Sequence, residues 1–211
     1  MDNANRILVL FAHPALHKSW VNRRLIRAIG DLEHVTLHDL YEAYPSFHID
    51  VKREQALLLA HDVIVFQHPF YWYSSPAILK EWQDLVLEHG FAYGAGGTAL
   101  AGKKFLSAIT TGGQQQAYSR SGANRFAIRE LLAPFEQTAR LCGMDWLPPF
   151  VIHGTHLLRE AGQIDPYVRS YRLLLMGLRD DTVRWDGLSE GEYLYHNLER
   201  VLGPSPVTDH A

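Results

Sequence analysis

Short apolar runs alternate along the chain with longer segments in which apolar residues recur every three or four positions. The runs predict buried strands, and the recurring segments predict amphipathic helices. The expected strands cover 7–12, 34–40, 63–67, 103–110 and 146–152. The expected helices cover 19–29, 50–60, 77–88, 124–141 and 164–178. Strands joined through helices pair in parallel by right-handed crossovers, so the pattern predicts an α/β fold.

Five strands in this rhythm fit a flavodoxin-like, doubly wound parallel sheet of order 2-1-3-4-5, with helices on both faces, better than a barrel. Pro148 and Pro149 interrupt the last strand, which suits an edge position. The 211 residues suggest one core domain, 1–180. We expect the C-terminal extension, 181–211, to pack on this domain or on a partner subunit.

The formal net charge is −3, without a block of like charges, which argues against a dedicated nucleic-acid binder. The single cysteine, Cys142, cannot form an internal disulfide, and its setting predicts a small buried hydrophobe. No apolar run has the length of a membrane span, and the first residues do not resemble a signal peptide. We therefore expect a cytoplasmic protein.

An aromatic loop, 68–76, follows the third expected strand and carries four consecutive rings, Phe70 to Tyr73. Pro69 and Pro76 flank these rings and disfavour both a helix and a continuing strand. Open α/β sheets bind ligands at the carboxyl ends of their strands, where this loop lies. Two interpretations stay open: a wall for a flat ligand, or packing against a helix or a second subunit.

The loops after the first and fourth strands also have features of binding sites. Ser19 and the free amides of the following helix turn form a potential anion site, although this loop taken alone favours Ser19 as a simple N-cap. Gly112 and Gly113 let the backbone approach a planar ligand, or form a tight turn.

Histidine pairs offer little support for a metal site. His13 and His17 are four residues apart, but Pro14 lies between them. His153 and His156 are three residues apart without a clear carboxylate as third ligand. We predict no metal.

Taken together, the loops resemble those of the NAD(P)H:quinone oxidoreductases, which are flavin proteins with a flavodoxin-like fold. Within that family the chain is most similar to the ancillary proteins of the glutathione-regulated potassium-efflux systems. The resemblance spans about residues 6 to 156. The segments that carry it are 12–14, 19–22, 67–73 with Pro76, 89–94, 97–100, 110–113, 142–143 and 146–150.

The resemblance implies a non-covalently bound flavin, FMN in preference to FAD. It assigns the flavin phosphate, without an arginine clamp, to His13, Ser19, Trp20, Val21 and Asn22. It assigns the ribityl chain and one edge of the ring to Phe70, Tyr71, Trp72 and Tyr73. It assigns the pyrimidine side of the ring to Thr110, Thr111, Gly112 and Gly113.

In this family NADH or NADPH gives a hydride to the flavin, and a quinone then takes it in a ping-pong reaction. Tyr118 lies where relatives keep a tyrosine that hydrogen-bonds the flavin or the quinone, so we expect it to be catalytic. Some quinone reductases have a histidine six residues further on, where this chain has Asn124. An amide cannot take up a proton near neutral pH, which favours hydrogen bonding over a proton relay at that position.

The resemblance thus predicts an FMN-dependent NAD(P)H:quinone oxidoreductase that acts as a homodimer. The alternative is a regulatory ancillary subunit that contacts a membrane potassium-efflux transporter from the inner face of the membrane. The two roles are compatible. A flavodoxin-like electron carrier without substrate turnover is a third, weaker possibility.

Overall fold

The computed structural model describes residues 4–185 and 194–202. The strands are β1 (Ile7–Phe11), β2 (Val35–Asp39), β3 (Val63–Pro69), β4 (Lys104–Thr110), β5 (Asp145–Trp146) and β6 (Phe150–Ile152). The α-helices are α1 (Trp20–Arg27), α2 (Leu40–Ala43), α3 (Val51–Leu59), α4 (Ala77–Val86), α5 (Ile128–Leu131), α6 (Ala133–Leu141), α7 (Thr155–Ala161), α8 (Asp165–Arg179) and α9 (Leu194–Leu202). Two short 3₁₀ helices are η1 (Leu16–Lys18) and η2 (Gln115–Ala117).

The sheet has the predicted order, β2-β1-β3-β4-β5, and every strand pair is parallel. The fifth expected strand is divided into β5 and β6, which both pair with β4. Pro148 and Pro149 lie between the two pieces and have no amide hydrogen to donate to the sheet. The flavodoxin-like fold predicted from the sequence is confirmed.

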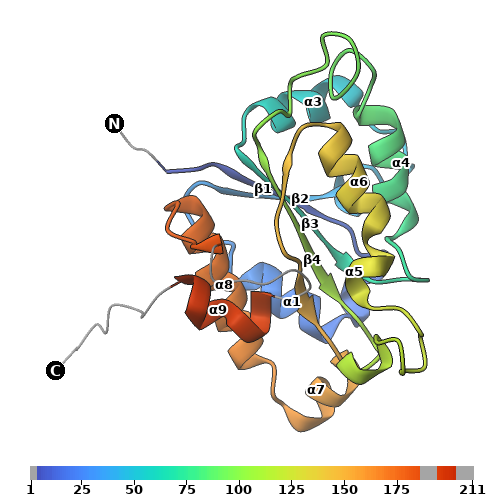
Figure 1. The fold of residues 1–211 in the computed structure, drawn as a ribbon, viewed down its shortest axis with the longest axis vertical. Coiled ribbons are helices and arrows are strands. Elements are labelled where there is room, and N and C mark those ends of the chain that lie inside the picture. The colour runs from blue at the N-terminus through green and yellow to red at the C-terminus, as the bar shows by residue number, and fades with distance from the viewer. Residues whose placement is uncertain (1–3, 186–193, 203–211) are drawn as a thin grey trace, which may run out of the picture.

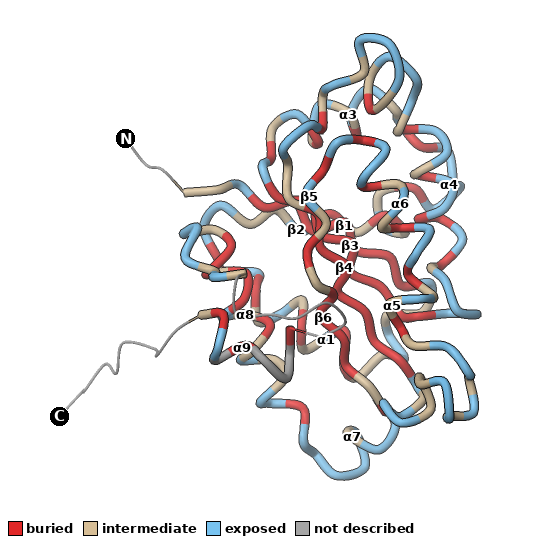
Figure 2. The backbone as a smooth tube through the Cα atoms, viewed as in Figure 1, coloured by how far each residue is buried: buried red, intermediate tan, exposed pale blue. Residues whose placement is uncertain are grey.

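Helices cover both faces of the sheet (Figure 1). Helices α3, α4 and α6 lie over one face, while α1, α8 and α9 lie over the other. Strands β1, β3, β4 and β6 are almost wholly buried, whereas β2 and β5 are partly exposed. Exposed residues gather on the outer sides of the helices and in the loops (Figure 2). Because both sheet faces are covered, the inner strands are continuous apolar runs rather than alternating ones.

Several helices begin at a residue whose side chain caps the first turn. The Asp50 carboxylate accepts a hydrogen bond from the Arg53 amide at 3.1 Å and caps α3, close to the start of the helix expected over 50–60. The Asp39 carboxylate caps α2 in the same way by accepting from the Tyr41 amide at 3.0 Å. Helix α2 was not expected, because four residues are too short for a helical period to show in the sequence.

The prediction of a single helix over 124–141 is wrong. The structure has two helices, α5 and α6, which meet at Leu132. Pro134 cannot donate a hydrogen bond to the Glu130 carbonyl, so one continuous helix cannot pass this point. The Glu130 side chain instead accepts from the Ala127 amide at 2.8 Å and starts α5 there.

A buried carboxylate lies between α3 and its neighbours. Glu54 has no exposed surface. Its side chain accepts hydrogen bonds from three donors, one in β2, one at the end of α2 and one in α4. The donors are His38 Nε2 at 2.8 Å, Trp82 Nε1 at 2.8 Å and the Tyr44 hydroxyl at 2.5 Å. Burial opposes the charge, but these hydrogen bonds hold the pKa of Glu54 below its usual value. The inner face of α3 therefore includes a charged side chain beside the apolar Leu58.

Strand β3 is two residues longer than predicted and includes His68 and Pro69. His68 is fully buried and stacks on Phe135, with ring centroids 5.8 Å apart. Its Nδ1 donates a hydrogen bond to the Pro69 carbonyl at 2.9 Å. Burial lowers the pKa of His68 to about 4, so the folded protein keeps this side chain neutral.

This burial predicts a loss of stability in acid. An unfolded histidine has a pKa of about 6.5. Between that pKa and about 4 the unfolded chain therefore binds a proton at His68 that the folded chain does not. From pH 7 to about 4 the free energy of unfolding should fall by about 3 kcal/mol from this group. Urea unfolding across this range should show a shallower pH dependence for His68→Gln than for wild type, and His48→Gln should follow wild type. Parallel curves for wild type and His68→Gln would contradict the prediction.

The described part of the C-terminal extension lies against the core. Helix α9 buries Leu194, Leu198 and Val201 in the same apolar cluster as α1 and α8. Trp185 also packs against this cluster. Tyr193 and the side chain of Tyr195 lie outside the described residues.

In residues 4–185 and 194–202, every helix is too short or too polar to cross a lipid bilayer.

Candidate functional site

Two adjoining cavities lie beside the loops that leave the carboxyl ends of β1, β3 and β4. Their volumes are about 480 and 400 Å³, within the usual range of small-molecule sites. Of the predicted site residues, the first cavity is lined by His13, Ser19, Trp20, Val21, Asn22, Phe70, Tyr71, Thr110 and Gly112. The second is lined by Phe70, Tyr71, Trp72, Tyr73, Gly113 and Tyr118. The two cavities share the walls formed by Phe70 and Tyr71.

The first turn of α1 forms one wall of the first cavity. The Ser19 hydroxyl caps this helix and accepts hydrogen bonds from the Asn22 amide at 3.2 Å and from Asn22 Nδ2 at 3.1 Å. Asn22 Nδ2 also donates to the Thr110 hydroxyl at 3.1 Å, which ties the end of β4 to α1. The amides of Trp20 and Val21 lie in the first turn, where backbone N–H groups have no carbonyl partner within the helix. This wall therefore offers an anion two amide donors and the positive end of the helix dipole.

His13 adds a neutral donor to the same wall. The Ala15 amide donates a hydrogen bond to His13 Nδ1 at 3.1 Å, so the ring carries its proton on Nε2. Burial lowers the pKa of His13, which favours the neutral form. The site can therefore bind an anion through hydrogen bonds without a full positive charge at this residue.

Basic side chains also line the first cavity, and the sequence interpretation missed the two that come from α7. Arg159 and His156 reach it from α7, and Lys18 reaches it from η1. Arg159 thus lines the cavity for which the resemblance implied no arginine clamp. Helix α7 has only seven residues and lies between Gly154 and Gly162, which both have φ of 65°. A helix of this length is too short for its hydrophobic period to be detected in the sequence.

The aromatic loop is a tight turn. Trp72 and Tyr73 have φ of 50° and 63°, and the Ser74 amide donates to the Tyr71 carbonyl at 3.0 Å. Positive φ at both central residues is typical of a type I′ turn, which usually carries Asn and Gly. Phe70 is buried, whereas Trp72 is 91% exposed, so the four rings differ in environment. The start of the predicted loop, His68 and Pro69, belongs to β3 instead.

The turn after β4 lies at the boundary between the cavities. Gly112 and Gly113 line the first and the second cavity respectively. A Cβ atom at Gly113 would lie 3.1 Å from Tyr118 Cε2, so a larger residue would crowd this wall. Thr111 lines neither cavity; it is buried behind the turn, where its hydroxyl donates to the Gly113 carbonyl at 2.7 Å.

Tyr118 is half-buried and lines the second cavity. Burial raises the pKa of Tyr118, and a hydrogen bond with Thr111 acts in the opposite direction. Asn124 lies on the rim of the same cavity, and its Oδ1 accepts a hydrogen bond from the Tyr73 hydroxyl at 3.2 Å. This bond joins the aromatic turn to the loop before α5.

The geometry fits a flavin mononucleotide. The first cavity supplies amide, hydroxyl and imidazole donors for a phosphate. The buried Asn22 Oδ1 has no hydrogen-bond partner in the described part of the chain, and as an acceptor it would suit a hydroxyl group of a ligand rather than the phosphate. The second cavity supplies rings and a glycine turn for a planar heterocycle. Within the described ranges, three His, Cys, Asp or Glu side chains nowhere gather closely enough to hold a metal ion.

Comparisons with known proteins place this architecture in a family. Residues 5–174 match the family described as having the flavodoxin-like fold. The glutathione-regulated potassium-efflux system ancillary protein KefG of Serratia proteamaculans is 54% identical over 153 residues, which cover 72% of this chain and 84% of that protein.

Solved structures agree with the sequence relatives. The general stress protein 14 of Treponema denticola, solved in complex with FMN, is 37% identical with a TM-score of 0.77, and the match covers 82% of this chain and 99% of that one. The NADPH-quinone reductase of P. pentosaceus is 34% identical with a TM-score of 0.73, covering 81% and 97%. The chain therefore belongs to the flavodoxin-like NAD(P)H quinone reductase family.

Proposed function

We propose that this chain is an FMN-binding ancillary protein of a glutathione-regulated potassium-efflux system. The observation that carries the proposal is the similarity to KefG proteins, at 51–54% identity over 84–87% of the length of two of them. The family match over residues 5–174 includes the loops of both cavities, so the ancillary role is proposed together with an intact flavin site.

Potassium efflux from cells tests this role. A strain that lacks its own ancillary protein but keeps the transporter should lose potassium slowly when an electrophile depletes glutathione. Expression of this chain should restore fast efflux, and a variant without flavin should show whether the cofactor is needed. Unchanged efflux with the wild-type chain, at matched protein level, would contradict the ancillary role.

Quinone reduction is the second candidate function, and it is compatible with the first. It is supported by the second cavity, in which Tyr118 and the aromatic turn surround space for a planar acceptor beside the glycine turn. A bound FMN would supply the hydride chemistry, while the protein supplies binding and orientation. NAD(P)H and the quinone would use the same cavity in turn, which gives ping-pong kinetics.

Absorption spectroscopy tests the enzymatic role directly. The purified protein should bind FMN and absorb near ~450 nm, as oxidised flavins do. NADH or NADPH should bleach this band, and a quinone should restore it. A protein that takes up no FMN from excess cofactor would exclude this function.

A homodimer would cover the exposed rings of the aromatic turn. Trp72 is 91% exposed in the single chain, and a large exposed aromatic is typical of an interface anchor. We predict that Trp72→Ser weakens self-association by about 2 kcal/mol, which is roughly thirtyfold in the dissociation constant. Sedimentation equilibrium measures this change. Leu141→Ser, at a 60% exposed residue at the end of α6, is the matched control and should leave self-association unchanged.

A further inference from the structure

Helix α7 presents one face to the first cavity. Thr155, His156 and Arg159 all line this cavity, and Arg159 follows the other two by four and three residues, which places the three side chains on one side of a helix. Leu158 instead packs against the apolar cluster that α1 and α8 share. Helix α7 also lies beside α1 (Figure 1). The fold therefore brings Arg159 to the same cavity as the first turn of α1.

Both ends of α7 are fixed to the rest of the fold. The Gly154 amide donates a hydrogen bond to the Gly113 carbonyl at 2.9 Å, and the Thr155 amide donates to the Thr111 carbonyl at 3.1 Å. After the helix, Ile164 is 1% exposed in the apolar cluster of α1 and α8. These contacts hold the helix backbone in place, so an anion that binds to α7 has to order side chains only, which lowers the entropic cost of binding.

The lining of the first cavity carries positive charge and no carboxylate. Lysine and arginine side chains are charged at neutral pH, and the lining includes Lys18 and Arg159 but no aspartate or glutamate among the described residues. Arg159 forms no ion pair with a residue that the structure describes, so its guanidinium group is available to a ligand. The neutral His13 and the amides of α1 donate hydrogen bonds but add no full charge. Two full positive charges therefore line the cavity.

A phosphate monoester matches these two charges. Its second pKa is about 6, so it carries a charge of about −1.5 to −2 at neutral pH. A carboxylate carries a single negative charge and would leave one of the two cations unmatched. The planar guanidinium group of an arginine can also bind two phosphate oxygens at once, which a lysine cannot do. The cavity is therefore suited to a dianionic phosphate on an otherwise neutral molecule.

We propose that Arg159 is a specificity-determining residue, which binds the phosphate of the flavin together with Lys18 and selects FMN over riboflavin. The inference rests on the flavin site proposed above and deepens it. The resemblance assigns the phosphate to His13 and the first turn of α1, without an arginine. Those donors orient the phosphate by hydrogen bonds, whereas the two cations raise its affinity and make binding depend on salt.

Fluorescence titration of the flavin-free protein with FMN and with riboflavin tests the proposal. Arg159→Gln should weaken FMN binding about tenfold, the lower range for a charge-assisted hydrogen bond, because Arg159 is exposed. Riboflavin, which lacks the phosphate, should bind both proteins equally. Arg159→Lys keeps the charge without the planar fork and should weaken FMN binding less than Arg159→Gln does. Arg53→Gln, at an exposed arginine of α3 that lines neither cavity, is the matched control and should bind both flavins as wild type does.

Salt dependence separates the charge of Arg159 from its shape. Raising the ionic strength from about 0.05 to about 0.5 M should weaken FMN binding to wild type, because salt screens exposed charges. The dependence should be shallower in Arg159→Gln and should be kept in Arg159→Lys. Riboflavin binding should change little with salt in all three proteins. Equal salt dependence of FMN binding in wild type and Arg159→Gln would contradict the role of the charge.

Chemical modification tests the contact in the wild-type protein. Phenylglyoxal reacts with exposed arginines, and mass spectrometry of peptides gives the rate at each position. Saturating FMN should slow the modification of Arg159, whereas saturating riboflavin should not. Arg53 should react at the same rate with either flavin. Modification of Arg159 at one rate with and without FMN would place the phosphate away from α7.

The outcomes separate this inference from the function on which it rests. Tight FMN binding that Arg159→Gln leaves unchanged would overturn the inference and leave the flavin site standing. Equal weakening of FMN and riboflavin would indicate a structural role of Arg159 and would also overturn the inference. A wild-type protein that binds neither flavin would overturn the flavin site and the inference together.

Discussion

Glu54→Ala is expected to lower the free energy of unfolding by about 4 kcal/mol, because it removes the acceptor of three buried donors. Trp82 is 1% exposed and His38 is 8% exposed, so neither can replace its hydrogen bond with water. Glu54→Gln should cost about 2 kcal/mol, because the amide group keeps the volume but points hydrogens at one of the donors. Urea unfolding followed by tryptophan fluorescence measures both effects.

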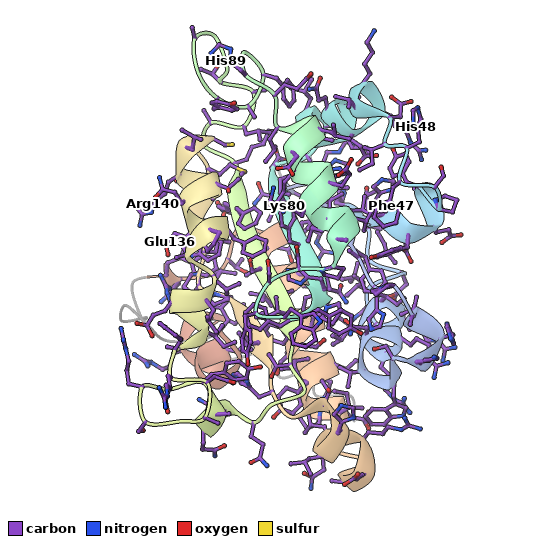
Figure 3. All side chains as sticks on the ribbon, turned by 90° about the vertical axis from the view of Figure 1, so that its right-hand side faces the viewer. Phe47, His48, Lys80, His89, Glu136 and Arg140 are labelled. Atoms are coloured by element: carbon purple, nitrogen blue, oxygen red, sulfur yellow. The ribbon has the colours of Figure 1, made fainter. Side chains whose placement is uncertain are left out.

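Glu136→Ala is the matched control for this prediction. Glu136 lies on α6 and is half-buried, and its carboxylate pairs with Arg140 at 2.8 Å (Figure 3) and with Arg129 at 3.6 Å. Water reaches these pairs, and pairs near the surface contribute roughly 0–1 kcal/mol each. Similar losses of stability for Glu54→Ala and Glu136→Ala would show that the buried hydrogen bonds at Glu54 are unimportant.

Ser19→Asp is expected to weaken FMN binding at least a hundredfold, while riboflavin binding stays within about twofold. Aspartate is a good N-cap, so α1 should stay intact. The new carboxylate would lie beside the donors of the first cavity and repel a phosphate, with an energy of several kcal/mol for like charges at such distances. Riboflavin lacks the phosphate, and its ring would occupy the second cavity. Fluorescence titration with both ligands gives the two dissociation constants.

A cap exchange elsewhere controls for effects on the helix. Asp50→Ser reverses the substitution at the start of α3, which contributes no residue to either cavity. It should leave both affinities unchanged. Equal weakening of FMN and riboflavin by Ser19→Asp would indicate damage to the fold, and no weakening would place the phosphate away from α1.

The strands and their order could be predicted because both faces of the sheet are covered. Complete burial makes the inner strands continuous apolar runs, and short connections through helices leave few topologies. The predicted ends differ from the structure where a single residue overrides the pattern. His68 extends β3 although its side chain is polar, because the backbone carbonyl of Pro69 satisfies Nδ1.

Glu54 shows what a hydrophobic pattern cannot reveal. A glutamate in the middle of an amphipathic helix normally marks the solvent face, so the pattern placed only apolar residues inside. Its burial depends on His38 and Trp82, which are 16 and 28 residues away in the sequence. A contact of this kind becomes visible only when the chain is folded.

Most of the candidate site was predicted from three loops, since parallel strands bring their carboxyl ends to one edge. The resemblance to a family then assigned roles to those loops, and the assignment to a flavin remains a prediction. Arg159 and His156 were missed as residues that line the first cavity. Both residues come from α7, which follows the last strand and is too short to leave a periodic signal in the sequence. Nothing in the composition indicated that this helix lies beside the cavity.

The type I′ turn at Trp72 and Tyr73 has a consequence for engineering. Each non-glycine residue at positive φ costs on the order of 1 kcal/mol or more, so Asn-Gly at these positions would stabilise the isolated chain. The same change would remove two rings from the second cavity. Directed evolution for heat resistance alone would therefore tend to replace the two rings that line the second cavity. A useful screen must select for ligand binding at the same time.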